Sequence, residues 1–157
     1  MQQIILPGCA ISVIETIDIC NNEKMVTYVI NYNQLKPQGK GVLYIKRLEE
    51  LTNGLSHEKK LFQILSQEGF TPQNLVSRME SFYPNGEKLT PEQLRQYSRK
   101  GIGSILFKLM VAHALKEDAK AIYTVSGTDS GMSFFRKKEL TEVDTPGFQA
   151  NLFYKLI

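Results

Sequence analysis

The sequence predicts an α/β (α+β) protein with a mixed, largely antiparallel central sheet that is flanked by helices. Three strand-like segments with short polar connections open the chain, and a strand–helix–strand unit lies in its second half. Strands joined by short turns pair antiparallel, whereas a helical crossover joins parallel strands, so the two patterns together indicate a mixed sheet. The predicted element order is β-β-β-α-β-α-β-α-β.

The front half reads as a meander of strands. Residues 10–20 alternate, and one face carries Ile11, Val13, Ile17 and Ile19. Residues 25–32 alternate again and are rich in β-branched and aromatic side chains, and residues 42–48 form the third segment. A period of two with such residues is typical of half-buried strands.

The back half alternates helices with strands. Ser56 is a candidate N-cap for a helix that Gly69 ends, and Thr90 is the candidate cap of a short helix over 91–97. Gly101 and Gly103 break that helix, and a second helix is predicted from there to about Asp118. The remaining elements are strands over 74–83, 121–126 and 148–157 and a short helix within 129–140.

Length and composition indicate one ordinary globular domain over residues 1–157, with 42% hydrophobic and 22% charged residues. No apolar run approaches the roughly 18 residues that span a membrane. The N-terminal residues 1–19 lack a positive region and include Pro7, Gly8, Glu15 and Asp18, so they read as strand rather than signal peptide. We therefore expect a cytoplasmic protein and no membrane partner.

Metal and disulfide chemistry are not expected. The chain has two cysteines, Cys9 and Cys20, and two histidines, His57 and His113, without metal-ligand spacing. We expect His57 on the surface at the start of its helix, and His113 in the core or on the surface. The net charge of +3 suits an anionic ligand as well as nucleic acid and decides between neither.

The segment "RKGIGS", residues 99–104, stands out because two glycines precede a long apolar-periodic helix. A helix N-terminus offers unpaired N–H groups and a positive dipole end, and glycines let an anion approach them. The dinucleotide fingerprint needs a third glycine, and the P-loop needs Gly-Lys-Ser/Thr; neither is present. Alone, the turn is equally a phosphate cradle or a kink between helices.

This stretch resembles the acetyl-CoA-binding motif of the GNAT acyltransferases, R/Q-x-x-G-x-G/A at the start of a long helix; here it is Ser98 to Gly103. The family continues with a short strand and a segment like N-x-x-A-x-x-F-Y-x-K-x-G-F. At the matching distance the chain has "AIYTVS" and "TDSGMSFFRKKEL", in which Gly131, Phe134 and Lys137 align. The resemblance covers about residues 95–157 and implies a GNAT-like acyl-CoA fold.

The resemblance implies an enzyme that moves an acetyl group from acetyl-CoA to an amine acceptor, either a small molecule or a protein. The implied cofactor-binding residues are Ser98, Arg99, Lys100, Gly101, Ile102, Gly103 and Ser104. The strand at 74–83 would separate from the strand at 121–126 and admit the pantetheine arm. Glu80 is the candidate general base, because an attacking amine must be neutral; a surface carboxylate or a partner of Arg78 is the alternative.

Two departures from the family pattern keep other readings open. Ser98 replaces the usual Arg or Gln, and Phe135 stands where many members have the Tyr that protonates the leaving thiolate. Tyr97, Tyr123, Tyr154 or water are the alternative acids. A catalytically impaired module that binds CoA or a protein is therefore one alternative. A nucleic-acid-binding domain is a weaker one, because the helix after the turn is mostly apolar. A homodimer is left open.

Overall fold

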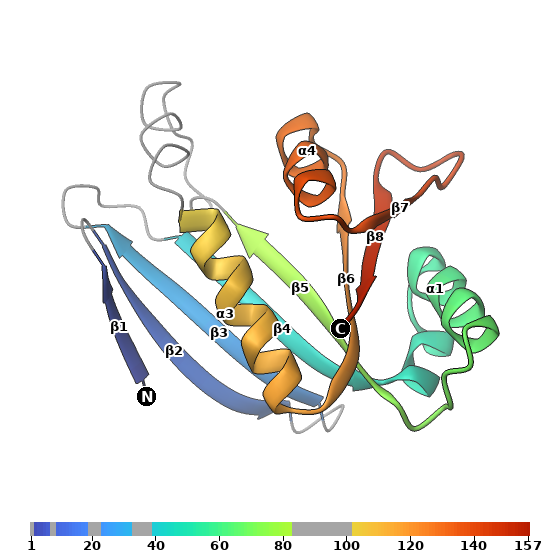
Figure 1. Cartoon of the computed structure of the whole chain (residues 1–157), viewed down its shortest axis with the longest axis horizontal. Helices are drawn as coiled ribbons and strands as arrows, with labels where there is room; N and C mark the ends of the chain where they lie inside the picture. The colour runs from blue at the N-terminus through green and yellow to red at the C-terminus, as the bar shows by residue number, and fades with distance from the viewer. Residues whose placement is uncertain (1, 7–8, 19–22, 33–38, 83–101) are drawn as a thin grey trace. The chain divides into compact units, whose positions relative to one another are not determined.

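Eight strands form one sheet in the order β1-β2-β3-β4-β5-β6-β8-β7 in the computed structural model, which describes residues 2–6, 9–18, 23–32, 39–82 and 102–157 (Figure 1). The strands are β1 (Gln2–Leu6), β2 (Cys9–Asp18), β3 (Glu23–Tyr32), β4 (Gly39–Arg47), β5 (Leu75–Phe82), β6 (Ala119–Ser126), β7 (Thr141–Val143) and β8 (Asn151–Leu156). The described helices are η1 (Leu48–Asn53), α1 (Ser56–Gln67), α3 (Ile102–Lys116) and α4 (Asp129–Lys137). The predicted class, a mixed and largely antiparallel sheet with helices, is confirmed.

The described chain forms two compact units, each assembled from two stretches of sequence. Unit 1 comprises Met1–Tyr44 and Met79–His113, and unit 2 comprises Ile45–Arg78 and Ala114–Ile157. Strands β4 and β5 and helix α3 contribute residues to both. That residues 1–157 make a single domain remains a prediction.

In unit 1, β1 pairs antiparallel with β2, and β2 with β3. The strands predicted over 10–20, 25–32 and 42–48 correspond to β2, β3 and β4, whereas β1 was not predicted as a separate strand. Val13 pairs with Tyr28 and Ile11 with Ile30, and all four side chains are buried on one face. The same face predicted from residues 10–20 also included Ile17, but its side chain is 65% exposed, so burial ends before the strand does. Ile19 lies outside the described residues.

Helix α3 packs against β4 within unit 1 at a glycine. A Cβ at Gly41 would stand 2.7 Å from Met110 Cε and 2.9 Å from Leu106 Cδ2, so the absence of a side chain permits this close approach. Leu106 and Met110 are both buried, as expected for the apolar stripe of the helix. The apolar face of α3 therefore packs against β4.

Unit 2 has its own hydrophobic core, which is built from residues of both helices and strands. The fully buried members are Leu48, Leu51, Leu61, Leu65, Val76, Ala121, Tyr123 and Leu152. Strand β5 runs parallel to β6, whereas β6 pairs antiparallel with β8 and β8 with β7. Neither the short β7 nor the 3-10 helix η1 was among the predicted elements.

Helix boundaries differ from the sequence prediction in ways that have local causes. Ser56 is the first residue of α1 rather than its cap, because Glu58 reaches back to accept a hydrogen bond from the Leu55 N–H at 3.3 Å. Gly69 ends the helix as predicted, with φ at +94°. Helix α3 begins at Ile102, close to its predicted start, and Gly103 lies in its first turn. The helix predicted over 91–97 lies outside the described residues.

Candidate functional site

The glycine segment leads directly into helix α3. Ser98, Arg99, Lys100 and Gly101 lie outside the described residues, whereas Ile102 opens the helix and half-buried Gly103 and Ser104 follow in its first turn. The first four N–H groups of an α-helix have no acceptor within the helix. The described end of the segment therefore has the donors that an anion requires.

Helix α3 is the crossover between two parallel strands, β5 and β6. Their register is Val76 with Ala121, Ser77 with Ile122 and Arg78 with Tyr123, which is the last pair among the described residues. Both strands continue beyond it, β5 to Phe82 and β6 to Ser126 (Figure 1). That the two strands separate beyond these pairs, as the family resemblance implies, remains a prediction.

Glu80, the candidate base, lies on β5 two residues beyond Arg78 and is half-buried. Side chains two apart on a strand point to the same face, so Glu80 shares a face with Arg78. Arg78 itself contacts Glu58, with Nη1 3.4 Å from Oε1. Whether Glu80 acts as a base remains a prediction.

Sequence reasoning missed the buried carboxylate of Glu58, which is held by charged and polar groups of unit 2. The residue is 3% exposed, and the Tyr123 hydroxyl donates to Oε2 at 2.5 Å. Lys46 Nζ lies 3.6 Å from Oε2 on another side. Burial alone would raise the pKa of Glu58, but the hydrogen bond from Tyr123 and the charges of Lys46 and Arg78 outweigh it and lower the pKa.

The amino-acid sequence gave little indication that Glu58 would be buried among charged and polar partners. Glu58 sits in the polar run "SHEKK", and its hydrogen-bond partner Tyr123 is 65 residues away in the chain. The local signal was a Glu three residues after the last non-helical residue, a spacing that suits a helix cap. The contacts with β4, β5 and β6 depend on the tertiary fold.

The candidate acids for the leaving thiolate are only partly described. Tyr123 is fully buried and donates its hydroxyl proton to Glu58, so its O–H is already engaged. Tyr154 is half-buried on β8, and Tyr97 lies outside the described residues. Phe135 packs its ring against Phe134 and Phe153, with centroids 5.3 and 5.7 Å away. The Phe135 ring thus takes part in aromatic packing.

The two histidines lie in different settings. His57 was expected on the surface, but this is wrong: it is 7% exposed, and its Nε2 lies 2.9 Å from the Ala150 carbonyl oxygen and 3.2 Å from Thr145 Oγ1. The helix start therefore holds the chain segment between β7 and β8. This long-range contact could not be predicted from a histidine at the first turn of a helix.

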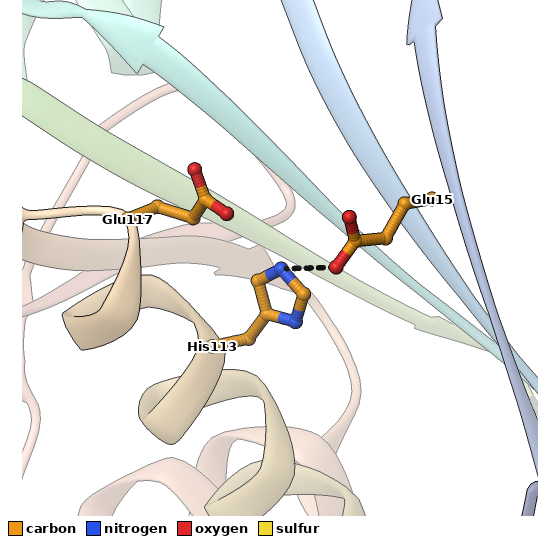
Figure 2. A group of neighbouring side chains, drawn as sticks. All are labelled: Glu15, His113 and Glu117. Atoms are coloured by element: carbon orange, nitrogen blue, oxygen red, sulfur yellow. Dashed lines mark ion pairs between the residues drawn. The ribbon is translucent and has the colours of Figure 1, made fainter. Parts of the chain in front are cut away.

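His113 points from α3 toward Glu15 on β2, within unit 1, and its Nε2 lies 3.2 Å from Glu15 Oε1 (Figure 2). The Tyr28 hydroxyl, buried on the same sheet face as Glu15, has no hydrogen-bond partner among the described residues. Burial, and next the charge of Glu15, raises the pKa of Tyr28. Figure 2 also draws Glu117, which follows His113 by four residues.

Comparison with known proteins supports the fold rather than a close relationship. No family model matches the chain, and no curated protein matches its sequence. Among solved structures, the apo form of a mutant agmatine N-acetyltransferase matches with a TM-score of 0.50 and 8% sequence identity, over 83% of this chain and 76% of that one. At this identity the likeness shows the fold alone, which is of the GNAT-like kind that the sequence predicted.

Among the described residues, no helix combines the length and the apolar character needed to cross a membrane.

Proposed function

We propose that this chain is an acyl-CoA-dependent N-acyltransferase that moves an acetyl group from acetyl-CoA to the nitrogen of an amine. The observation that carries the proposal is the position of the glycine segment: it leads into α3, the crossover helix between the parallel strands β5 and β6. A glycine segment that suits a phosphate and a pair of parallel strands thus belong to one β5–α3–β6 unit. The likeness to an N-acetyltransferase fold supports the same function.

In this proposal the backbone N–H groups of residues 99–104 bind the pyrophosphate, with Arg99 and Lys100 as its nearest cations in sequence. Ser98 completes the binding segment, and Ser104 adds a hydroxyl in the first turn. The pantetheine arm lies between β5 and β6. A backbone N–H on a strand there can stabilise the thioester oxygen as it becomes negative.

The reaction is a direct transfer between the two substrates. Glu80 takes a proton from the ammonium form of the acceptor, and the neutral nitrogen attacks the thioester carbonyl carbon. The C–N bond forms, and the attacking nitrogen then gives its second proton to water. The C–S bond breaks, and the sulfur leaves with its electron pair as a thiolate, which is protonated by water or by Tyr154. The products are an N-acetylated amine and CoA with a free thiol. Since Phe135 cannot supply a proton, transfer does not depend on it.

Ligand binding provides the most direct test. Acetyl-CoA and CoA at about 100 times their dissociation constant should stabilise the native state by about 2.7 kcal/mol, which raises the melting temperature by several degrees. Gly103→Asp should abolish this shift, because a carboxylate in the first turn repels the pyrophosphate while it suits the helix dipole and preserves folding. Gly103→Ala, which adds no charge, is the matched control. No shift with either ligand would refute the proposal.

A thiol-release assay over a panel of amines separates the enzyme from a module that only binds CoA. Release of free thiol that depends on the added amine supports acyl transfer. Binding without amine-dependent release across the panel would favour the impaired module, for which Ser98 and the absence of a hydroxyl at Phe135 are the arguments.

A further inference from the structure

Strand β1 is one edge of the sheet, and it pairs with β2 alone among the described strands (Figure 1). The pairing runs without a bulge from Gln2 opposite Val13 to Leu6 opposite Cys9. In an antiparallel ladder, the N–H and C=O groups of alternate residues point away from the neighbouring strand. The outer side of β1 therefore presents backbone donors and acceptors to which another strand can bond.

This edge lacks the features by which proteins usually protect an exposed strand. Such features are charged side chains, proline, a bulge or a very short strand. Neither Gln2–Leu6 nor Cys9–Val13, the part of β2 that pairs with it, contains a charged residue or a proline. The opposite edge, β7, has three residues, and its Glu142 is held by Arg136. Only one of the two edges is thus protected.

The side chain that projects most from this edge is apolar. Ile5 is 72% exposed, the largest fraction among the described large hydrophobic residues that are exposed. It lies opposite Ala10, so it shares a sheet face with Ala10 and, by alternation, with the 38% exposed Ile14. The buried Val13 lies on the other face. A strand added to the edge would cover Ile5.

Two-fold symmetry sets a condition on a strand that pairs antiparallel with its own copy. Directly opposite residues alternate along such a ladder between hydrogen-bonded and non-hydrogen-bonded pairs. The symmetry relates the pair of residues i and j to the pair of residues j and i, and these must be of the same kind. The two positions therefore differ by an even number, and one residue of the strand lies on the axis, opposite its own copy.

Strand β1 meets this condition because none of its residues carries a charge. A charged residue on the axis would face the same charge, which is destabilising. The residues of β1 are glutamine, isoleucine and leucine, and each can face its own copy: glutamine both donates and accepts, and the other two pack as apolar pairs. A strand of another protein would not require this neutrality, since opposite charges could then pair.

We propose that β1 is a homodimer interface, in which Gln2–Leu6 of one chain pairs antiparallel with Gln2–Leu6 of a second copy about a two-fold axis. The outward N–H and C=O groups of each strand bond to those of the copy, and Ile5 becomes covered. The interface belongs to unit 1 and does not depend on the proposed acyl transfer.

Sedimentation velocity from about 1 to about 200 μM protein tests the association, since it covers dissociation constants in the micromolar range. We expect a reversible monomer–dimer equilibrium for the wild type. Ile5→Lys should raise the dissociation constant about tenfold or more, because it adds two like charges to each interface. Ile17→Lys is the matched control, since Ile17 is 65% exposed on β2 beyond the stretch that pairs with β1. It should leave the constant within about twofold.

Circular dichroism verifies that the variants fold, and Gln3→Lys, also at an exposed position of β1, replaces Ile5→Lys if that variant does not. A wild type that stays monomeric over the whole concentration range would overturn the proposal and leave the edge to a strand of another protein. A dimer that Ile5→Lys does not weaken, or that Ile17→Lys weakens equally, would overturn it as well.

Single cysteines distinguish pairing through β1 from any other dimer. Each is introduced at one of residues 3–5 in a chain that also carries Cys9→Ser and Cys20→Ser. Opposite Cβ atoms in a ladder are about 4.5–5.5 Å apart, close enough for mild oxidation to link the residue on the axis to its copy. We expect one of the three positions to form linked dimers about tenfold faster than Thr16→Cys, an exposed control on β2. Equal rates at all four positions would contradict the pairing.

Discussion

Single residues in this protein carry charge into places where burial would oppose it. Glu58 shows how this is tolerated: a tyrosine hydroxyl, a backbone N–H and two cations surround one carboxylate, and its pKa falls despite desolvation. Glu142 on β7 is a second carboxylate with several partners, held by Arg136 from α4 and by Asn151 from β8. In both cases the partners lie on different helices and strands, so the environment of each carboxylate depends on the tertiary structure.

The Glu142 carboxylate makes stability depend on acid pH. Its hydrogen bonds with Arg136, at 2.7 and 2.8 Å, and then with Asn151 lower its pKa to about 2. An unfolded glutamate titrates near 4.3. Because the folded pKa is the lower one, the contribution is fully present above about pH 4.3 and is lost as the pH falls toward 2.

Denaturant unfolding between pH 6 and pH 2 checks this expectation. Glu142→Gln should flatten the acid-side decline in the free energy of unfolding relative to the wild type. Glu68→Gln is the control, since Glu68 is exposed and has no ion pair among the described residues. Parallel pH profiles for the wild type and Glu142→Gln would contradict the prediction.

The role assigned to Glu80 is tested by its own substitution. Glu80→Gln should lower kcat by about 10²- to 10⁴-fold, the range for loss of general base catalysis. Binding of acetyl-CoA should be preserved, because the residue acts on the amine. The defect should shrink as the pH approaches the pKa of the amine, where the neutral form no longer needs a base. A loss of the same size at every pH would point to a structural role instead.

At the scale of elements, alternating apolar residues predicted the strands, and residues typical of helix ends predicted the helix boundaries. The alternating apolar positions of β2 and β3 face one side together because antiparallel pairing places Val13 opposite Tyr28 and Ile11 opposite Ile30. The exposure of Ile17 shows the limit of this rule, since alternation predicts a shared face but not how far the covering element extends. Helix α1 ends at its predicted glycine for a reason of backbone conformation.

Gly69 gives a prediction for that helix end. Its φ is +94°, and a Cβ added there would have no atom within 4 Å, so the constraint is conformational rather than steric crowding by neighbours. Gly69→Ala should destabilise the protein by about 1 kcal/mol, because this region of backbone space is unfavourable for L-residues. Chemical denaturation measures it, with Ser66→Ala in the last turn of α1 as the control. No loss of stability would show that the helix end rearranges.

At the scale of the whole molecule, charge is the property that bears on the proposed substrate. The chain carries a net charge of +3, and the phosphates of acetyl-CoA are anionic. Salt screens such attraction, with a Debye length of about 10 Å at 0.1 M and about 3 Å at 1 M. Acetyl-CoA should therefore bind several-fold more weakly at about 1 M than at about 0.1 M potassium chloride.

Isothermal titration at the two salt concentrations checks the charge effect, with sucrose at equal osmolality as the uncharged control. Affinity that is independent of salt would show that the phosphates are held by backbone groups alone, without help from Arg99 or Lys100.

The sequence by itself determined the class of fold and most of its elements, because alternation, capping residues and turn glycines act over a few neighbouring positions. It also indicated the glycine segment before α3. The role of Ser98 to Gly101 in binding CoA remains a prediction. Only the tertiary structure decided which side chains meet: Glu58 with Tyr123, His57 with Ala150, and His113 with Glu15. The reason is physical, since these contacts join residues that are far apart in the chain, and burial and pairing arise only when strands and helices pack together.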